Sequence, residues 1–273
     1  MCSIFGISRS GYYASADRKE CQRHKEDVAL MPIIKSTFKR GRSTYGARSI
    51  RDILSGMGIL ISRRRTRRLM DQQGLYPQTA KAFRHGTTTQ SKHPIPTPDL
   101  VNRKFSADAP NRIWTGDITE VPTSEGKLYV AIIEDLFSRL VVGWGMMASK
   151  TVLLVQLAFR MACIRRSGQL LKGCVFHSDK GSQYDCKDFR ADLAKKEFLQ
   201  SMGSTGDCFD NAITESAFST LKSECLFGKQ FSTRDEARNH IFDYIEAFYN
   251  RVRRHTALGN LSPEEFERRW YGG

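Results

Sequence analysis

Three acidic residues, far apart in the chain, are the strongest candidates for chemistry: Asp117, Asp179 and Glu215. Asp117 lies within a strand-like run, although aspartate is a poor strand residue. A buried carboxylate in a core strand costs several kcal/mol unless a partner or a bound cation balances its charge. Taken alone, Asp117 is explained more simply by an edge position that faces water.

The other two acidic residues stand at the ends of predicted elements. Asp179 follows an apolar strand-like run, and the carboxyl end of a strand is where α/β proteins place ligands. An aspartate that caps a turn is the simpler explanation of this residue by itself. Glu215 falls near the start of a helix that Asp210 or Asn211 can cap, where a surface glutamate is common.

Together, the three carboxylates match a specific requirement of phosphodiester chemistry. Mg²⁺ is a hard cation that prefers oxygen ligands. Two such ions, about 3.5 to 4 Å apart, activate the attacking oxygen and stabilise the leaving oxygen of an in-line displacement. Such catalysis depends on positioning and electrostatics and needs no protein nucleophile. We therefore expect two divalent ions at this site, Mg²⁺ with Mn²⁺ as a substitute.

The elements that must bring these residues together follow an α/β pattern. Strand-like runs cover 113–121, 128–133 and 140–146 and indicate an antiparallel meander. A helical pattern from Val152 to Met161 follows, then an apolar strand at 173–176, a helix after Tyr184 and a short strand near Phe198. This order predicts a mixed five-stranded sheet flanked by helices, which is the RNase H-like architecture.

Upstream of the strands, two short helices are predicted around a glycine turn. The first begins near Gly46 and breaks at 56–58, and the second begins after Ser62, a good N-cap, and closes at Gly74. This is the outline of a helix-turn-helix over about 44–76, whose second helix would enter a major groove. An earlier helical pattern contains Pro32, which should kink or delay that helix.

The second helix of this pair is strongly basic. Its apolar side consists of Thr66, Leu69 and Met70, so its arginines must lie around the rest of the helix. Arginine suits phosphates and guanine edges, although a solvated basic face is the alternative. The arginines that we predict to bind DNA are Arg63, Arg64, Arg65, Arg67 and Arg68.

These patterns divide the chain into four parts. We predict a helical DNA-binding region at 1–76, a basic linker with several prolines at 77–111, a catalytic core at 112–228 and a C-terminal helical extension of that core at 229–273. The basic residues of the linker could follow a DNA backbone, and a solvated spacer is equally compatible with its composition.

Composition narrows the class of partner. The 43 Lys and Arg residues outnumber the 29 Asp and Glu residues, and the net charge of +14 favours nucleic acid, although a ribosome-associated or merely basic enzyme would also fit. The seven cysteines include no C-x-x-C pair, which argues against a zinc cluster or a disulfide framework. No apolar run reaches the roughly 18 residues that span a bilayer, and no signal-peptide pattern is present, so we expect a cytosolic protein without a membrane partner.

The motifs resemble those of insertion-sequence transposases of the IS-three group, which belong to the D-D-E superfamily of retroviral-integrase-like enzymes. Thirty-five residues lie between Asp179 and Glu215, as in that group. The likeness covers nearly the whole chain. Other matching segments are 8–13, 44–48, 135–139, 219–224 and 249–250.

The resemblance implies a function and a set of site residues. Asp117, Asp179 and Glu215 would form the metal-binding catalytic triad of a DNA transposase that cuts and joins strands at terminal inverted repeats and in target DNA. Lys222, two helical turns beyond Glu215, would contact DNA ends, and a solvated lysine is the alternative. Gly116 replaces a commoner choice beside Asp117, without touching the triad.

The resemblance also implies partners and a location. Synapsis of two ends implies a homo-oligomer on double-stranded DNA, and transposition would copy the insertion sequence through a branched and then a circular intermediate. A product of an upstream reading frame of the same insertion sequence is a further expected partner. This chain begins almost at the 8–13 motif and so resembles the downstream product alone. We expect it in the bacterial cytosol, associated with the nucleoid.

Two other functions fit parts of the pattern. One is a DNA-binding regulator whose core no longer reacts, which would bind ends without cutting them. The other is an RNase H-type nuclease that cleaves hybrids or junctions without joining strands.

Overall fold

The computed structural model describes residues 6, 8–16, 21–78, 97–102, 106–203 and 219–272. Glu215 and most of the predicted linker lie outside these residues, so their predicted roles stay predictions. The chain divides into two compact units, Met1–Pro77 and Gln78–Gly273.

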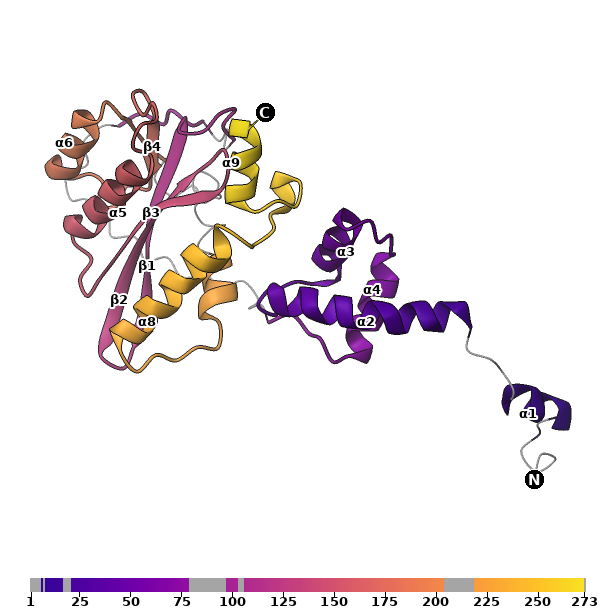
Figure 1. Cartoon of the computed structure of the whole chain (residues 1–273). Coiled ribbons are helices and arrows are strands. Elements are labelled where there is room, and N and C mark those ends of the chain that lie inside the picture. Colours follow the sequence, from indigo (N-terminus) through magenta and orange to yellow (C-terminus); the bar gives the residue numbers. More distant parts are fainter. Residues whose placement is uncertain are drawn as a thin grey trace. The chain divides into compact units, whose positions relative to one another are not determined.

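The described part of the N-terminal unit is helical, as the sequence predicts. Its helices are α1 Arg9–Ala16, α2 Gln22–Arg40, α3 Ala47–Gly56 and α4 Arg63–Gln72 (Figure 1). A shared apolar core holds α2, α3 and α4 together, because each helix turns one hydrophobic side inward. The buried residues of this core are Ile34, Phe38, Tyr45, Ile50, Leu54, Leu69 and Met70.

The ends of the predicted helix pair lie where the sequence places them. The Ser62 hydroxyl accepts a hydrogen bond from the Arg65 backbone N–H at 3.2 Å, which caps α4. Gly74 follows this helix in the left-handed region, with φ of 66°. The prediction that Pro32 delays its helix is wrong, because α2 begins at Gln22 and runs through the proline. The carbonyl that loses its helical partner belongs to the exposed Val28, where water can satisfy it.

The C-terminal unit contains the predicted mixed sheet. Its strands are β1 Ile113–Thr123, β2 Gly126–Asp135, β3 Leu140–Met147, β4 Val175–Ser178 and β5 Leu199–Met202. They lie in the order β3-β2-β1-β4-β5. β1, β2 and β3 form an antiparallel meander, whereas β4 pairs parallel with both β1 and β5. This topology confirms the RNase H-like fold.

Both faces of the sheet are covered, since successive strand residues point to opposite faces. Along β2, Ala131 and Ile133 face the core under α5 Val152–Arg165 and α6 Lys187–Lys195. Val130 and Ile132 face the opposite core. That core is closed by the π-helices η1 Leu221–Leu226 and η2 Asp243–Tyr249 and by α8 Arg234–Phe242 (Figure 1). The chain ends in η3 Thr256–Leu258 and α9 Pro263–Gly272.

The contact between α5 and β3 depends on a glycine. A Cβ atom at Gly143 would lie 2.2 Å from the Ala158 carbonyl oxygen and 2.8 Å from the Ala162 side chain. The neighbouring atoms belong to a helix backbone that cannot move aside by itself. The sheet and this helix therefore approach more closely than any residue with a side chain would permit.

We expect Gly143→Ala to lower the free energy of unfolding of the C-terminal unit by about 1–3 kcal/mol, because α5 must shift to relieve the overlap. Urea denaturation followed by tryptophan fluorescence measures this loss. Gly272→Ala is the control, since a Cβ atom there meets nothing within 4 Å. If the two variants had the same free energy of unfolding, α5 could shift away from β3 without a loss of stability.

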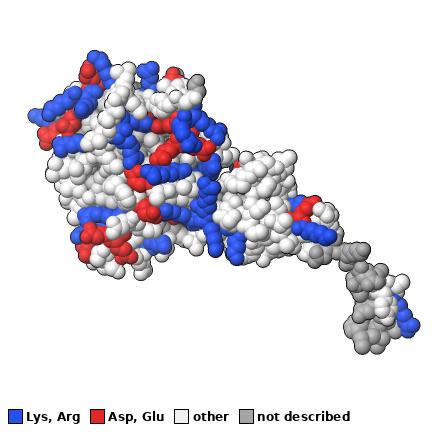
Figure 2. Space-filling view, viewed as in Figure 1, with Lys and Arg blue, Asp and Glu red and all other residues white. Residues whose placement is uncertain are grey.

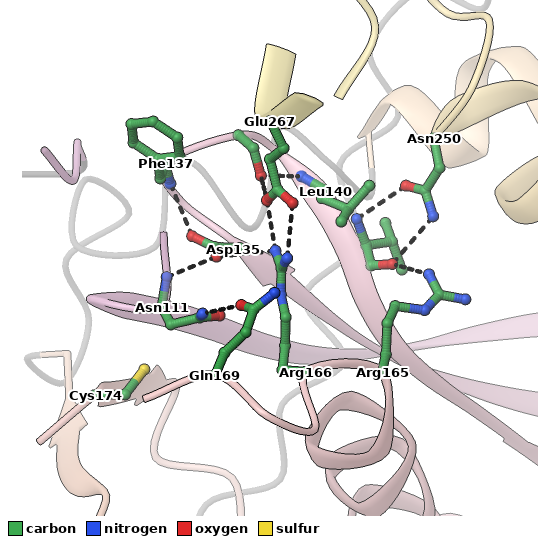
Figure 3. Close-up of polar contacts among 12 residues, drawn as sticks. Asn111, Asp135, Phe137, Leu140, Arg165, Arg166, Gln169, Cys174, Asn250 and Glu267 are labelled. Carbon is green, nitrogen blue, oxygen red and sulfur yellow. Dashed lines mark hydrogen bonds and ion pairs between the residues drawn. The ribbon is translucent and has the colours of Figure 1, made fainter. Parts of the chain in front are cut away.

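A buried ionic network ties α9 to the sheet (Figure 3). Arg166, just past α5, donates to Asp135 at 3.2 Å and to Glu267 of α9 at 2.7 Å. Asp135 also accepts hydrogen bonds from the backbone N–H groups of Asn111 and Phe137. The three charged side chains are almost completely buried, so each depends on the others for charge compensation.

The end of the predicted linker packs against the last strand of the sheet. The Leu100 N–H donates to the Ser201 hydroxyl at 2.9 Å, and the Met202 N–H donates to the Pro98 carbonyl at 3.2 Å. Val101 is buried at this contact. The chain from Thr97 to Asn102 is therefore anchored along β5.

Candidate active site

Two of the three predicted carboxylates come from neighbouring strands: Asp117 lies within β1, and Asp179 is the residue that follows β4. Gly116 of β1 pairs with Ser178 of β4 in a parallel register, and the next residues in the chain are Asp117 and Asp179. Because paired strands lie about 4.8 Å apart, the two aspartates stand side by side. Glu215 lies outside the described residues.

The electrostatics of Asp117 reflect this proximity. Desolvation raises the pKa of its carboxyl to about 7, and the charge of Asp179 contributes to the same shift. The Ile118 N–H, which donates to Asp117 at 2.7 Å, and the charges of Lys222 and Lys150 act in the opposite direction. Two like charges are thus held close together in a partly desolvated position, an arrangement that a bound cation would relieve.

The loop after β4 orients Asp179. Its Oδ1 atom accepts a hydrogen bond from the Gly181 N–H at 3.0 Å, so this aspartate also caps a turn. A Cβ atom at Gly181 would lie 2.9 Å from the same oxygen. The side chain of Gln183 donates to the Lys150 carbonyl at 3.3 Å and links this loop to the segment before α5.

Two aromatic rings pack against β1 at the residue before Asp117. A Cβ atom at Gly116 would lie 2.6 Å from the Phe176 ring and 3.4 Å from the Tyr184 ring, which explains why this chain has glycine beside Asp117. Tyr184 is buried, and its pKa is raised well above the ordinary value by desolvation and by the charges of Asp117 and Asp179. Because Gly116 and Asp117 are successive residues of β1, these rings pack on the opposite face of the sheet from the Asp117 side chain.

Within the described ranges, no group of three acidic, histidine or cysteine side chains converges on one point. Asp117 and Asp179 supply two oxygen-bearing side chains, and the predicted third, Glu215, lies outside those ranges. Lys222 and Lys150 place positive charge near the pair. Among the described residues, the carboxylates could therefore bind a cation, and the ammonium groups beside them could bind an anion.

The arginines of α4 divide into two groups. Arg65 and Arg68 both form ion pairs with Asp27 of α2, at 2.7 and 2.5 Å, and Arg65 also pairs with Glu26. These hydrogen bonds lower the pKa of the Asp27 carboxyl. Arg65 and Arg68 therefore hold α4 against α2, which sequence patterns did not predict.

The remaining predicted arginines face outward. Arg63 and Arg64 are exposed in the first turn of α4, and the largely exposed Arg67 lies 3.9 Å from Asp71. Beside this helix is an open hollow of about 810 Å³. Most of its lining is basic, which suits phosphate groups. The lining residues are Arg23, Ser62, Arg64, Arg65, Arg67, Arg68, Asp71 and Gln72.

Replacing Arg63 and Arg64 together by glutamine should weaken binding to duplex DNA about tenfold near 0.15 M salt and reduce the salt dependence by about two ions. Arg65→Gln should instead lower the melting temperature of the N-terminal unit, since it breaks the contact with Asp27. Fluorescence anisotropy across a salt series and thermal melting separate these effects. The division of the arginines into two groups would be contradicted if Arg65→Gln left the melting temperature unchanged and weakened DNA binding as much as the replacement of Arg63 and Arg64 does.

Three segments of the chain match known families. Residues 107–208 and 215–270 match two integrase core domain families, and residues 25–83 match an HTH-like domain. The chain is 40% identical to the insertion element IS600 uncharacterized 31 kDa protein of Shigella sonnei, over 99% of this chain and 98% of that protein. It is 36% identical to Transposase InsF for insertion sequence IS3A of Escherichia coli K12, over 98% of this chain and 92% of that protein. The chain belongs to the IS3 family of insertion-sequence transposases.

Among the solved structures to which this chain is similar is that of the HTLV-2 integrase catalytic core domain in complex with magnesium (trimeric form). It is 18% identical to this IS3-family transposase, covers 59% of the chain and 98% of the integrase chain, and has a TM-score of 0.41. The family assignment rests on the far closer sequence relatives.

Membership of the IS3 family confirms the resemblance seen in the motifs, and with it DNA transposition as the activity. The HTH-like and integrase core domains imply DNA binding. The HTH-like match begins within α2, whose Ile34 and Phe38 supply part of the core around α3 and α4. None of the helices among the described residues is both long and apolar enough to cross a bilayer.

Charge on the transposase is mixed on the face that Figure 2 shows. Basic and acidic side chains intermingle over the C-terminal unit. The C-terminal unit also contains exposed ion pairs, such as Lys127 with Glu120 and Lys172 with Glu197. The net charge of +14 therefore does not make this face uniformly basic.

Proposed function

We propose that this transposase cuts and joins DNA strands at terminal inverted repeats and target DNA, using divalent metal ions held by Asp117, Asp179 and Glu215. The observation that carries the proposal is the parallel pairing of Gly116 with Ser178, which brings Asp117 next to Asp179, the residue that follows β4. The raised pKa of Asp117 supports it, because such a carboxylate is stabilised in its charged form by a cation.

The side chains fit magnesium. Carboxylate oxygens are hard ligands, and two or three of them leave coordination positions for phosphate oxygens. A bound pair of Mg²⁺ ions, with Mn²⁺ as a substitute, supplies charge that activates the attacking oxygen and stabilises the leaving one. Asp117 and Asp179 would hold these ions together with Glu215, whose place in the site is part of the proposal.

The other residues position DNA. Lys222 and Lys150 would bind phosphate oxygens beside the carboxylates, since both act on Asp117. Arg63, Arg64 and Arg67 of α4 would contact the terminal repeat. We assign 1–76 to end recognition, 77–111 to the connection, 112–228 to catalysis and 229–273 to support of the core. A homo-oligomer on DNA and a product of an upstream frame complete the proposed assembly, in the bacterial cytosol near the nucleoid.

A strand-transfer assay tests the proposal. The full chain is incubated with Mg²⁺ and a labelled duplex that carries the inverted repeat flanking its reading frame, together with a target plasmid. We expect labelled strands joined to the target by the wild type and not by Glu215→Gln. Repeat binding with no cleavage would support a regulator instead. Cleavage of an RNA–DNA hybrid without joining would support a nuclease.

Metal binding should release a proton near neutral pH. The raised pKa of Asp117 means that folding favours its protonated form, so this group stabilises the metal-free fold below about pH 4 and loses that contribution as pH rises through 7. Mg²⁺ needs the ionised carboxylate, so its apparent affinity should fall as pH decreases below 7.

Calorimetric titration with Mg²⁺ in buffers of different ionisation enthalpy measures this release. We expect close to one proton per site near pH 6 and almost none near pH 9. Asp117→Asn is the control and should release no proton at either pH. If the wild type releases the same number of protons per site at pH 6 and at pH 9, the prediction is wrong.

A further inference from the structure

An ion pair holds η1, the π-helix that carries Lys222, on the side away from Lys222. Within η1, Leu221 and Cys225 are buried in the core between the sheet and α8. Glu224 accepts two hydrogen bonds from Arg253, each 2.7 Å long, one to each carboxylate oxygen. The Tyr244 hydroxyl donates to the same carboxylate at 2.9 Å.

This ion pair is shielded from water. The side chain of Glu224 is 10% exposed and that of Arg253 is 17% exposed. Charge-assisted, two-point pairing of a guanidinium with a carboxylate fixes orientation as well as distance. Removing one partner leaves the other charge partly buried without compensation. The pair therefore holds η1 in one rotational position.

Arg253 has rigid support of its own. Its backbone N–H donates to the Phe248 carbonyl at 2.8 Å, and its guanidinium lies over the Tyr249 ring, 5.8 Å from the centroid. The neighbouring His255 imidazole lies 3.2 Å from the guanidinium, and burial and this positive charge lower its pKa to about 3. A neutral imidazole can accept a hydrogen bond from the guanidinium without repelling it.

The segment before Arg253 is anchored to the edge of the sheet. The Asn250 side chain accepts from the Val141 N–H at 3.0 Å and donates to the Val141 carbonyl at 3.1 Å (Figure 3). β3 is the outermost strand on this side, so Asn250 takes the place of a missing strand partner. Hydrogen bonds thus fix Asn250 to β3, and Arg253, three residues further along the chain, holds Glu224 of η1.

Lys222 lies on the other side of η1 from Glu224. Residues two apart on a helix point in nearly opposite directions, so fixing Glu224 on one side directs Lys222 to the other. Val121 of β1 lies in the same core as Leu221 and Cys225 of η1, and Asp117, four residues earlier in the strand, points to that same face of the sheet. The effect of the Lys222 charge on the pKa of Asp117 agrees with this placement. A lysine side chain is flexible, so its reach toward a phosphate depends on a fixed backbone.

We propose that Arg253 is a positioning residue, which through Glu224 sets the rotation of η1 and so directs Lys222 at a DNA phosphate beside Asp117. This inference rests on the proposed function in one respect, the phosphate contact of Lys222. It assigns one structural role to the 219–224 and 249–250 segments, which is to fix the orientation of Lys222. It also separates Arg253 from its neighbour Arg254, which pairs with Glu265 of α9 at 2.9 Å.

The test measures DNA binding, without cleavage, in EDTA. The full chain is titrated into a labelled duplex that carries the flanking inverted repeat, over a salt series. We expect Lys222→Gln to weaken binding about tenfold and to reduce the salt dependence by about one ion. Arg253→Gln should do the same. The double variant should bind no more weakly than Lys222→Gln alone, because both changes remove one contact.

Arg254→Gln is the matched control and should bind like the wild type. The proposal is overturned when Arg253→Gln also binds like the wild type, or when the losses of the two single variants multiply in the double variant. A wild type that does not distinguish the repeat duplex from a scrambled duplex would count against the proposed function instead.

Circular dichroism and thermal melting establish that each variant is folded. If Arg253→Gln is not folded, Glu224→Gln takes its place, and DNA binding is measured for Glu224→Gln alone and combined with Lys222→Gln. Glu224→Gln keeps an oxygen for Tyr244 and Arg253 but removes the charge. A loss of about threefold or more that disappears in the Lys222→Gln background supports positioning. A loss that persists there in full refutes it.

Discussion

Asp117→Asn should reduce strand joining on the order of 1,000-fold while leaving affinity for the repeat duplex within about twofold. Asparagine has the same size and can accept the hydrogen bond that the Ile118 N–H gives to Asp117. It removes the charge that a divalent ion requires. The measurements are the single-turnover rate of strand transfer in Mg²⁺ and binding of the same duplex in EDTA.

Asp179→Asn should give a loss of the same order, and combining the two changes should add little, because residues that hold one metal site act as a unit. Glu120→Gln is the matched control, since this carboxylate lies in the same strand and pairs with Lys127 at its exposed end. A joining rate within tenfold of the wild type for either aspartate variant would contradict a metal site at these strands.

Arg166→Met should lower the free energy of unfolding of the C-terminal unit by about 3–5 kcal/mol at pH 8, because it leaves Asp135 and Glu267 buried without their shared cation. Burial already raises the pKa of Asp135 to about 6. Without Arg166 that pKa should rise further, so the carboxyl can take up a proton as pH falls. The loss should therefore be smaller at pH 5 than at pH 8, as measured by urea denaturation.

Arg160→Met provides the comparison for this prediction. Arg160 is exposed on α5, so its replacement should change stability by less than about 0.5 kcal/mol at both pH values. Equal losses for the two variants, or a loss for Arg166→Met that does not depend on pH, would mean that the network carries little of the stability of α9.

The sequence predicts the strands well because short runs of apolar and β-branched residues are a local signal. Residues 128–133 are apolar throughout, as expected of a strand that is buried on both faces: Val130 and Ile132 lie in one core and Ala131 and Ile133 in the other. The predicted antiparallel meander is the β3-β2-β1 part of the observed sheet, and the structure adds the pairing of β4 with β1 and β5. Asp117 and Asp179 were recognised through their neighbours in the chain, and parallel pairing of β1 with β4 explains why they meet.

Other features depend on contacts that no local pattern encodes. Arg65 and Arg68 look like any other arginines of a basic helix, and only the packing of α4 on α2 brings them to Asp27. Lys150 stands between a strand and a helix with no motif around it, yet its charge acts on Asp117. The pair of Glu224 and Arg253 joins residues whose separation follows no helical or strand period.

Anchoring of Thr97 to Asn102 along β5 shortens the tether between the two units. A wholly free connection over 77–111 could extend to roughly 120 Å, since an extended chain spans at most about 3.3–3.6 Å per residue. Counted from the end of the N-terminal unit to Thr97, the limit is roughly 65 Å. At about 3.4 Å per base pair, this limit on the distance between Pro77 and Thr97 corresponds to about twenty base pairs of a straight duplex, compared with about thirty-five for a wholly free connection.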